Sequence, residues 1–236
     1  MAAACMGLRT MAMVNLTNVD IVPSKITDLG VISFCHADCF PEALPVKLGA
    51  KYVQKNFEWF LKSPNRFLYH ILENGQVAGY VGGFCPQYNG DGSVSGMLQY
   101  SKKQAFQSFL TRPWLLFHVE IRKNFILILQ NLLTGGKKGA GTSSSSLTQS
   151  DKRLSLVVIG VHPTFRGKKV FEMLMLQFEQ EARQRELERL FLVVKKKNRR
   201  AIAAYKKVGW QEYKRMNDSV EMWKRLNQTE DCNIDP

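Results

Sequence analysis

A short segment in the C-terminal half of the chain has the composition of an anion-binding turn. An apolar run at 156–161 stops before Pro163, and Gly167 follows between Arg166 and Lys168. Proline ends strand pairing, and glycine lets the backbone turn before the helical pattern that starts there. Backbone amides at the start of a helix lack intrahelical partners and lie at the positive end of its dipole. The segment therefore predicts a site for a phosphate or pyrophosphate group.

Two strands and a further helix are expected to flank this turn. A second apolar run, at 190–194, follows the first after one helical segment at about 167–186. A strand–helix–strand unit places its two strands parallel and adjacent. The next helix carries Asn198, Ala201 and Tyr205 on one face, because their spacings are three and four residues. We expect a nucleotide-like ligand to bind between the C-terminal ends of the two strands.

Together, these two segments resemble the signatures of the GNAT superfamily of acetyl-CoA-dependent N-acetyltransferases. The sequence VHPTFRGK at 161–168 resembles the superfamily's acetyl-CoA-binding turn. Asn198, Ala201, Tyr205 and the Gly-Trp pair at 209–210 match its next signature at the usual spacing. Two signatures in this order, separated by one helix and one strand, are more specific than either alone.

The resemblance covers residues 155–226 well and residues 18–86 loosely, and it implies a fold. That fold is α/β, with a GNAT-like mixed, mostly antiparallel sheet flanked by helices. Acetyl-CoA would lie between the two parallel central strands, and a helical insertion would interrupt the domain. We expect a flexible leader at 1–16, the N-terminal half of the GNAT domain at 17–87, the helical insertion and a flexible linker at 88–153, the C-terminal half with the CoA-binding turn at 154–228, and a tail at 229–236.

The turn departs from the family pattern at two positions. That pattern is Arg or Gln, two residues, Gly, one residue, then Gly or Ala, and counted from Arg166 the two small positions hold Lys169 and Phe171. Small residues there let the pyrophosphate approach the backbone, so larger ones narrow the site. The resemblance implies that acetyl-CoA, as cosubstrate, contacts Ile159, Gly160, Val161, Arg166, Gly167, Lys168, Lys169, Val170, Phe171, Asn198 and Tyr205.

Acetyl transfer from a thioester to an amine needs a deprotonated amine, a donor to the thioester oxygen and an acid for the departing thiolate. A backbone amide near Val161 is the candidate donor. Tyr205 is the candidate acid, since GNAT enzymes commonly place a tyrosine there and a phenol pKa of roughly 10 lies near a thiol's roughly 8.5. The alternative is that Tyr205 only packs against the pantetheine arm. The base stays open among a water chain, Glu42, Glu58, Glu73, Glu120, His36 and His118.

The N-terminal half has the pattern with which the GNAT fold begins. Asn74-Gly75 between two apolar runs is the clearest hairpin signal in the chain. By analogy, residues 34–61 would supply part of the acceptor site. We expect a strand at 19–22, a helix capped at Pro23-Ser24 that runs through Cys39, a helix at 46–61, and hairpin strands at 67–72 and 76–84.

Composition narrows the remaining classes. A chain of 236 residues that is 45% hydrophobic fits one folded domain with an insertion. The net charge of +13 fits an anionic ligand, nucleic acid or a membrane surface. No interleaved aromatic pattern accompanies the basic run at 195–200, so we expect no nucleic-acid partner. Five cysteines without metal-type spacing favour a reducing, cytoplasmic location and no metal.

The insertion contains a strongly apolar stretch at 100–133. Two alternatives stay open for it: it packs on the domain as a lid or a homodimer contact, or it makes a peripheral contact with an anionic membrane at the inner surface. No charge-free apolar run is long enough to span a bilayer. The basic residues that border the stretch are Lys102, Lys103, Arg112, Arg122, Lys123, Lys137 and Lys138.

Two function classes follow from these expectations. The first is an acyl-CoA-dependent N-acyltransferase that acetylates a primary amine of a small molecule or sugar-linked intermediate. The second is a catalytically impaired GNAT-like CoA-binding module whose altered turn no longer supports turnover.

Overall fold

A seven-stranded sheet forms the centre of the molecule, in the order β1-β2-β3-β4-β5-β7-β6. The computed structural model describes residues 19–87, 92–114 and 153–226. Among the described strands β4 and β5 are parallel, and the other neighbours are antiparallel. The strands are β1 (Val19–Pro23), β2 (Arg66–Glu73), β3 (Gln76–Phe84), β4 (Leu154–Val161), β5 (Arg189–Lys195), β6 (Gln211–Arg215) and β7 (Ser219–Arg225).

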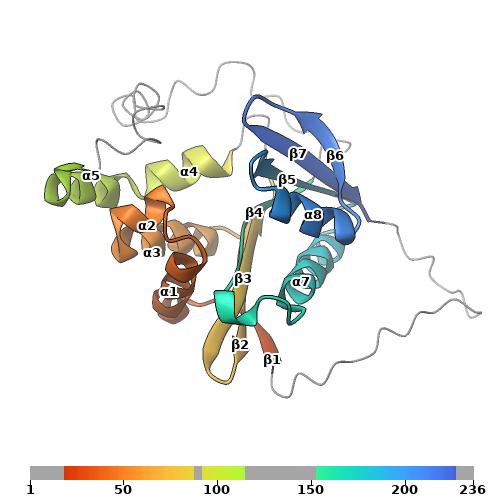
Figure 1. The fold of residues 1–236 in the computed structure, drawn as a ribbon, viewed down its shortest axis with the longest axis horizontal. Helices are drawn as coiled ribbons and strands as arrows, with labels where there is room; N and C mark the ends of the chain where they lie inside the picture. The colour runs from red at the N-terminus through yellow and green to blue at the C-terminus, as the bar shows by residue number, and fades with distance from the viewer. Residues whose placement is uncertain (1–18, 88–91, 115–152, 227–236) are drawn as a thin grey trace, which may run out of the picture.

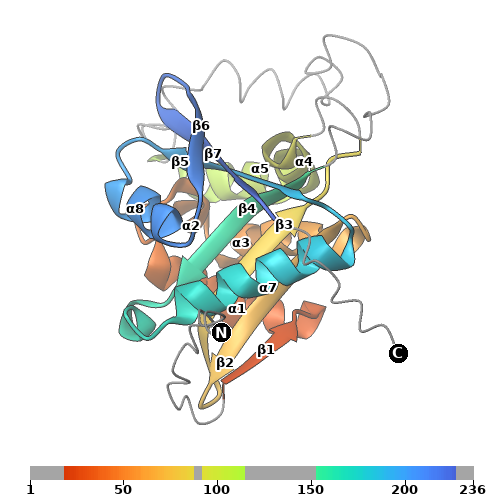
Figure 2. The same ribbon diagram turned by 90° about the vertical axis from the view of Figure 1, so that its right-hand side faces the viewer.

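Helices cover both faces of this sheet. Figures 1 and 2 show α1 and α3 against one face and α7 against the other. Short 3-10 turns lie at Ile26–Asp28, Trp59–Lys62 and Pro163–Phe165. The α-helices are α1 (Leu29–Cys39), α2 (Leu44–Leu48), α3 (Ala50–Glu58), α4 (Ser93–Tyr100), α5 (Lys102–Thr111), α7 (Val170–Gln184) and α8 (Arg199–Lys207).

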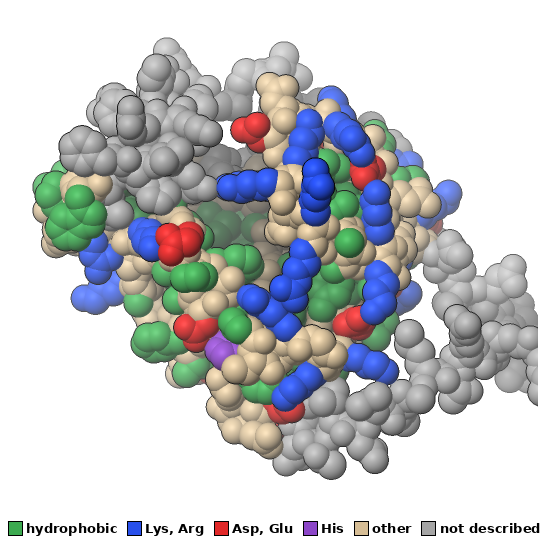
Figure 3. Space-filling model, in the orientation of Figure 1, with side chains coloured by type: hydrophobic (Ala, Val, Ile, Leu, Met, Phe, Trp, Pro, Cys, Tyr) green, Lys and Arg blue, Asp and Glu red, His purple; other side chains and the backbone are tan. Residues whose placement is uncertain are grey.

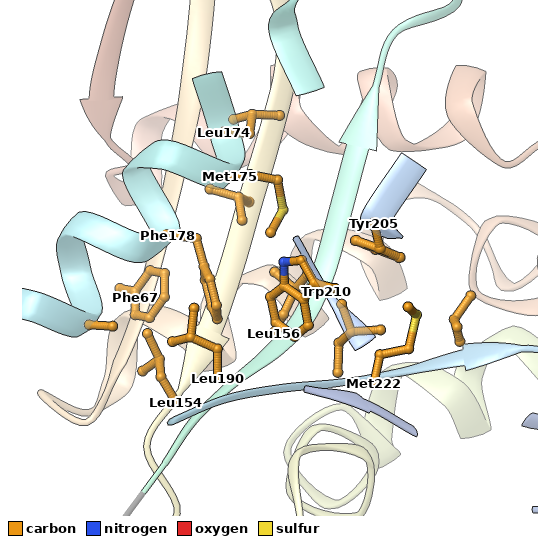
Figure 4. Packing of buried hydrophobic residues seen from close by; sticks show 14 of the residues in the cluster. Phe67, Leu154, Leu156, Leu174, Met175, Phe178, Leu190, Tyr205, Trp210 and Met222 are labelled. Carbon is orange, nitrogen blue, oxygen red and sulfur yellow. The ribbon is translucent and has the colours of Figure 1, made fainter. Parts of the chain in front are cut away.

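A hydrophobic cluster on the α7 side holds the two parallel strands in place. Leu174 and Phe178 of α7 pack with Leu154 of β4 and Leu190 of β5, and all four are fully buried (Figure 4). Trp210 extends the cluster toward α8. Burying a side chain of this size contributes roughly 1.5–3 kcal/mol. The strands that flank the expected ligand site are therefore among the best-anchored elements of the fold.

The expected hairpin is confirmed, including its turn. β2 and β3 pair antiparallel up to Glu73 and Gln76. Asn74 and Gly75 both have positive φ, 52° and 76°. Two consecutive positive φ angles are what a two-residue hairpin loop requires, and Asn-Gly adopts them at the lowest cost.

Two expectations about the N-terminal helices were wrong. Ser24 does not cap the first helix, because its hydroxyl hydrogen-bonds Nδ1 of His70 at 2.9 Å, and α1 begins only at Leu29. The single helix expected at 46–61 is broken at Gly49, whose φ of 106° is incompatible with a continuous helix. Both differences come from features that helical periodicity does not encode: a long-range hydrogen bond and one backbone angle.

The described part of the insertion packs on the domain. Ala105 and Phe109 of α5 contact Leu48 and Tyr52, which lie on α2 and α3. None of the described helices is long and apolar enough to cross a membrane. The expected leader, serine-rich linker and tail lie outside the described residues.

Candidate active site

β4 and β5 pair over only part of their length. The parallel pairing ends where Leu156 lies opposite Leu192. β4 nevertheless continues along β3 as far as Val161, and the register with β3 skips Val157. A β-bulge therefore marks the place where the two parallel strands separate. From there to its end, β4 has an edge toward β5 that no described strand covers.

Backbone amides of β4 point out of this open edge. His162 N donates to the carbonyl of Ala78 on β3 at 2.9 Å. Successive amides of a strand alternate between its two edges, so the amides of Val161 and Ile159 face the opposite way, toward β5. The hydrogen bond that the Val161 carbonyl accepts from Arg166 Nε, at 3.4 Å, is consistent with this direction. Two donors are thus available to an extended ligand that lies along β4.

The turn after β4 leads into the N-terminus of α7. Gly167 has a φ of 85°, and Lys169 has a φ of 61°. Met173 N donates to the carbonyl of Lys169 at 3.0 Å, so the amides of residues 170–172 precede the first helical hydrogen bond. These amides lie at the positive end of the helix dipole. The backbone of the turn therefore has the free amides that the expected anion site requires.

Basic side chains surround this turn and the start of α8. Arg166, Lys168 and Lys169 are exposed, as are all the residues at 195–200. Figure 3 shows Lys and Arg side chains over the half of the molecule formed by α7, α8 and the last strands, beside a hollow with hydrophobic side chains. An anionic ligand would find a favourable potential at this entrance.

Tyr205 lies in the core beneath the turn. Its ring centroid is 5.6 Å from that of Phe171 and 6.0 Å from that of Trp210, and the residue is 7% exposed. Burial raises the pKa of Tyr205 above the usual phenol range, so the hydroxyl stays protonated. Phe171 is half-buried and packs against Tyr205. Asn198 caps α8, because its Oδ1 accepts from Ala201 N at 3.2 Å.

Comparison with known proteins identifies the family. Residues 35–210, more than half of the chain, match the model of the acetyltransferase (GNAT) family. The chain belongs to the GNAT family. No curated protein sequence matches it. The GNAT-like mixed sheet, with its parallel central pair, is confirmed.

Solved structures of other GNAT enzymes share this fold. One is the ribosomal-protein-S18-alanine N-acetyltransferase from Escherichia coli, with 14% identity, 91% of this chain and 98% of that chain covered, and a TM-score of 0.51. The PaiA N-acetyltransferase from Thermoplasma acidophilum in complex with coenzyme A has 9% identity, 89% and 99% coverage, and a TM-score of 0.54. An aminoglycoside N-acetyltransferase in complex with CoA has 10% identity, 85% and 92% coverage, and a TM-score of 0.53.

A histidine–tyrosine pair covers the other face of β4 in this GNAT domain. The Tyr80 hydroxyl lies 2.5 Å from Nδ1 of His36, and a Cβ added to Gly160 would meet that hydroxyl at 2.5 Å. Gly160 therefore lets Tyr80 lie across the strand. Burial lowers the pKa of His36 to about 4 and raises the pKa of Tyr80. Both side chains are therefore neutral near pH 7, and one hydrogen bond joins them.

The contacts of His36 and Glu58 make both of them weaker candidates for the general base. His36 is a weak base, because one of its ring nitrogens is hydrogen-bonded to Tyr80 and burial lowers its pKa to about 4. Glu58 accepts from Lys55 and Tyr100, at 2.8 and 2.6 Å, and these contacts hold its pKa at about 2. A carboxylate with so low a pKa is a weak base. Glu42 is exposed beside Lys47, Glu73 ends β2, and Glu120 and His118 lie outside the described residues.

His162 ties the turn to α1. Its Nε2 lies 3.2 Å from Oδ2 of Asp38, and its Nδ1 lies 2.8 Å from Oγ1 of Thr164. Both ring nitrogens are occupied, which supports a structural role for His162. Asp38 and Tyr80 were not expected in the site, because nothing in their local sequence signals partners this far away. Cys35 and Cys39 are buried free thiols, and the described residues contain no metal-binding cluster.

The lowered pKa of His36 predicts that the free energy of unfolding depends on pH in the acid range. Its pKa is about 4 when folded and roughly 6.5 when unfolded, so the unfolded chain binds more protons between these values. The free energy of unfolding should therefore fall as the pH drops from 6.5 to 4, by up to about 3 kcal/mol. His70, whose pKa is also lowered by burial, acts in the same direction.

Urea unfolding at several pH values checks this expectation. His36→Gln keeps a hydrogen-bonding side chain for Tyr80 and removes the titration, so the stability of the variant should depend less on pH above 4.5. The carboxyl of Glu58 contributes only below that value. Parallel pH profiles for the two proteins would show that His36 is not desolvated.

Proposed function

We propose that this GNAT protein transfers the acetyl group of acetyl-CoA to a primary amine of a small molecule or sugar-linked intermediate. The observation that carries the proposal is the open edge of β4, which leads directly into the amide-rich turn before α7. A pantetheine arm can pair with the open edge of β4, and a pyrophosphate can bind the free amides of the turn. The buried free cysteines, Cys35 and Cys39, support a reducing cytoplasmic location.

The residues around the turn fit acetyl-CoA. The amides of Ile159 and Val161 are directed at the pantetheine arm, and those of residues 170–172 at the pyrophosphate. Lys168 and Lys169 are exposed beside these amides, within reach of phosphate oxygens. Phe171 is turned toward Tyr205, with 5.6 Å between the ring centroids, which is compatible with a ligand at the turn. When bound, acetyl-CoA supplies an activated acyl group.

The protein's own part in the reaction is positioning and proton transfer. The amide of Ile159 or Val161 is the candidate donor to the thioester oxygen as charge develops on it. Tyr205 is the candidate proton donor to the departing thiolate; burial keeps its phenol protonated at neutral pH and, by raising the pKa, makes it a weaker acid than a free phenol. The free amine is delivered from the α1 side, where solvent or an exposed carboxylate such as Glu42 takes its proton.

Thiol release tests the proposal. The full chain is first titrated with acetyl-CoA by calorimetry and then incubated with acetyl-CoA and a panel of primary amines, including amino sugars and their nucleotide-linked forms. We expect saturable binding and amine-dependent release of the CoA thiol. Binding without turnover on any amine would favour the alternative, a CoA-binding module. Absence of binding would reject both.

Lys169 gives a more specific prediction. Its φ of 61° is a left-handed conformation that costs a residue with a Cβ roughly 1–2 kcal/mol. Lys169→Gly should therefore stabilise the fold by about 1 kcal/mol and leave acetyl-CoA affinity intact or improved. Lys169→Ala is the matched control, since it removes the charge and keeps the strain. A large loss of affinity in both variants would show that the ammonium group binds phosphate.

A further inference from the structure

Helix α5 presents apolar side chains in two directions. Ala105 and Phe109 face α2 and α3, where they pack against Leu48 and Tyr52. The adjacent, solvent-facing side carries Phe106 and Leu110, four residues apart, and Trp114 follows just beyond the end of the helix. These three side chains, which we call the α5 outer face, are 60%, 69% and 64% exposed. A surface of this kind on a folded domain indicates a partner.

Positive charge accompanies the α5 outer face. Residues 92–114 include Lys102, Lys103 and Arg112 and no Asp or Glu. Lys102 and Lys103 are exposed in the first turn of α5, and neither forms an ion pair within the described parts of the chain. Lys51 on the neighbouring α3 is also exposed. Arg112 is turned inward, since its Nη1 donates to the carbonyl of Lys47 at 2.8 Å.

The α5 outer face lies at an edge of the molecule, away from the expected acetyl-CoA entrance. Figure 1 places α5 at the opposite side of the molecule from α8, and the two helices are also apart in Figure 2. Figure 3 shows hydrophobic side chains at this edge with Lys and Arg nearby. A partner held here leaves the turn before α7 accessible.

The size and chemistry of this face favour a lipid surface. Its three side chains expose on the order of 400 Å², whereas each partner of a stable protein dimer buries roughly 600–1,000 Å². An aromatic and aliphatic stripe with tryptophan at one end and lysines at the other is the pattern of interfacial membrane helices. Lysines near an anionic bilayer each add to binding. We propose that the α5 outer face, with Lys102 and Lys103, docks the protein peripherally on an anionic lipid bilayer.

Flotation of the full chain with lipid vesicles tests this proposal. Vesicles of phosphatidylcholine alone are compared with vesicles that also contain phosphatidylglycerol, at low and at physiological salt. The protein should float with the anionic vesicles and much less with the neutral ones, and added salt should weaken binding. Lys102→Ala with Lys103→Ala should weaken it about tenfold or more.

A matched pair of variants isolates the contribution of the apolar side chains to lipid binding. Leu110→Ser with Trp114→Ser should lower the bound fraction at least tenfold. Leu176→Ser with Tyr213→Ser changes two equally accessible side chains, both 62% exposed, on α7 and β6, and should bind like the parent. Quenching by brominated lipid gives a second readout, because Trp59 and Trp210 are buried and Trp223 is half-buried on β7, apart from α5 in Figure 1. Trp114→Phe should abolish most of the quenching.

Three results would overturn the proposal. The first is no flotation with anionic vesicles, or equal flotation with both kinds. The second is wild-type lipid binding by the Leu110/Trp114 variant. The third is a Leu110/Trp114 variant that changes the oligomeric state or lowers the melting temperature by several degrees, which would mean that protein covers this face. None of these results depends on acetyl transfer, so they leave the proposed reaction untouched.

Discussion

Gly167→Val should weaken acetyl-CoA binding by about tenfold or more. Gly167 has a φ of 85°, a region that a β-branched residue occupies only with strain of order 1–3 kcal/mol. A Cβ at this position would meet no atom within 4 Å, so the loss comes from the backbone rather than from crowding. To escape the strain the turn must move, and it then carries the amides of residues 170–172 away from the pyrophosphate. Isothermal titration with acetyl-CoA measures the effect.

Gly75→Val is the matched control for this variant. Gly75 also has a positive φ, 76°, and open space around it, but it lies in the hairpin turn between β2 and β3. Both variants should lose comparable stability, and only Gly167→Val should lose affinity for acetyl-CoA. Equal affinity in the two variants would count against the turn as the phosphate site.

Tyr205→Phe should lower kcat by roughly 100-fold or more, with little change in acetyl-CoA affinity. The phenylalanine ring keeps the packing against Phe171 and Trp210, so only the proton donor is removed. General acid catalysis contributes factors of roughly 10²–10⁴. The measurement is steady-state kinetics with the best amine of the panel, together with acetyl-CoA titration of the variant.

Tyr213→Phe serves as the control for this prediction, because Tyr213 is 62% exposed on β6. Turnover of Tyr205→Phe within a few fold of the parent would show that its hydroxyl is not the proton source. The alkaline side of the pH profile adds a second check. Since burial raises the pKa of Tyr205, its phenol should stay protonated, and kcat should not fall through ionisation of this group at or below pH 10.

Local signals in the sequence were sufficient for the main elements of the fold. Asn74-Gly75 predicted the hairpin because few dipeptides adopt two positive φ angles easily. The two apolar runs on either side of one helix predicted the parallel pair β4 and β5, since short crossovers allow few other arrangements. The position of the turn before α7 followed from Pro163 and Gly167.

Features that depend on contacts between distant residues could not be predicted. The bond between His36 and Tyr80 joins α1 to β3, and no local pattern marks either residue as a partner. The bulge at Val157 separates β4 from β5, although the surrounding apolar run reads as a regular strand. The helix break at Gly49 was not predicted either, because the apolar periodicity of the sequence continues through it.

Backbone hydrogen exchange with and without CoA tests most directly whether the ligand binds along the open edge of β4. We expect the amides of Ile159 and Val161, and those of residues 170–172, to become protected at saturating CoA, with smaller changes elsewhere in the sheet. Protection confined to another surface, or no change in these amides while calorimetry shows binding, would contradict the site proposed for acetyl-CoA.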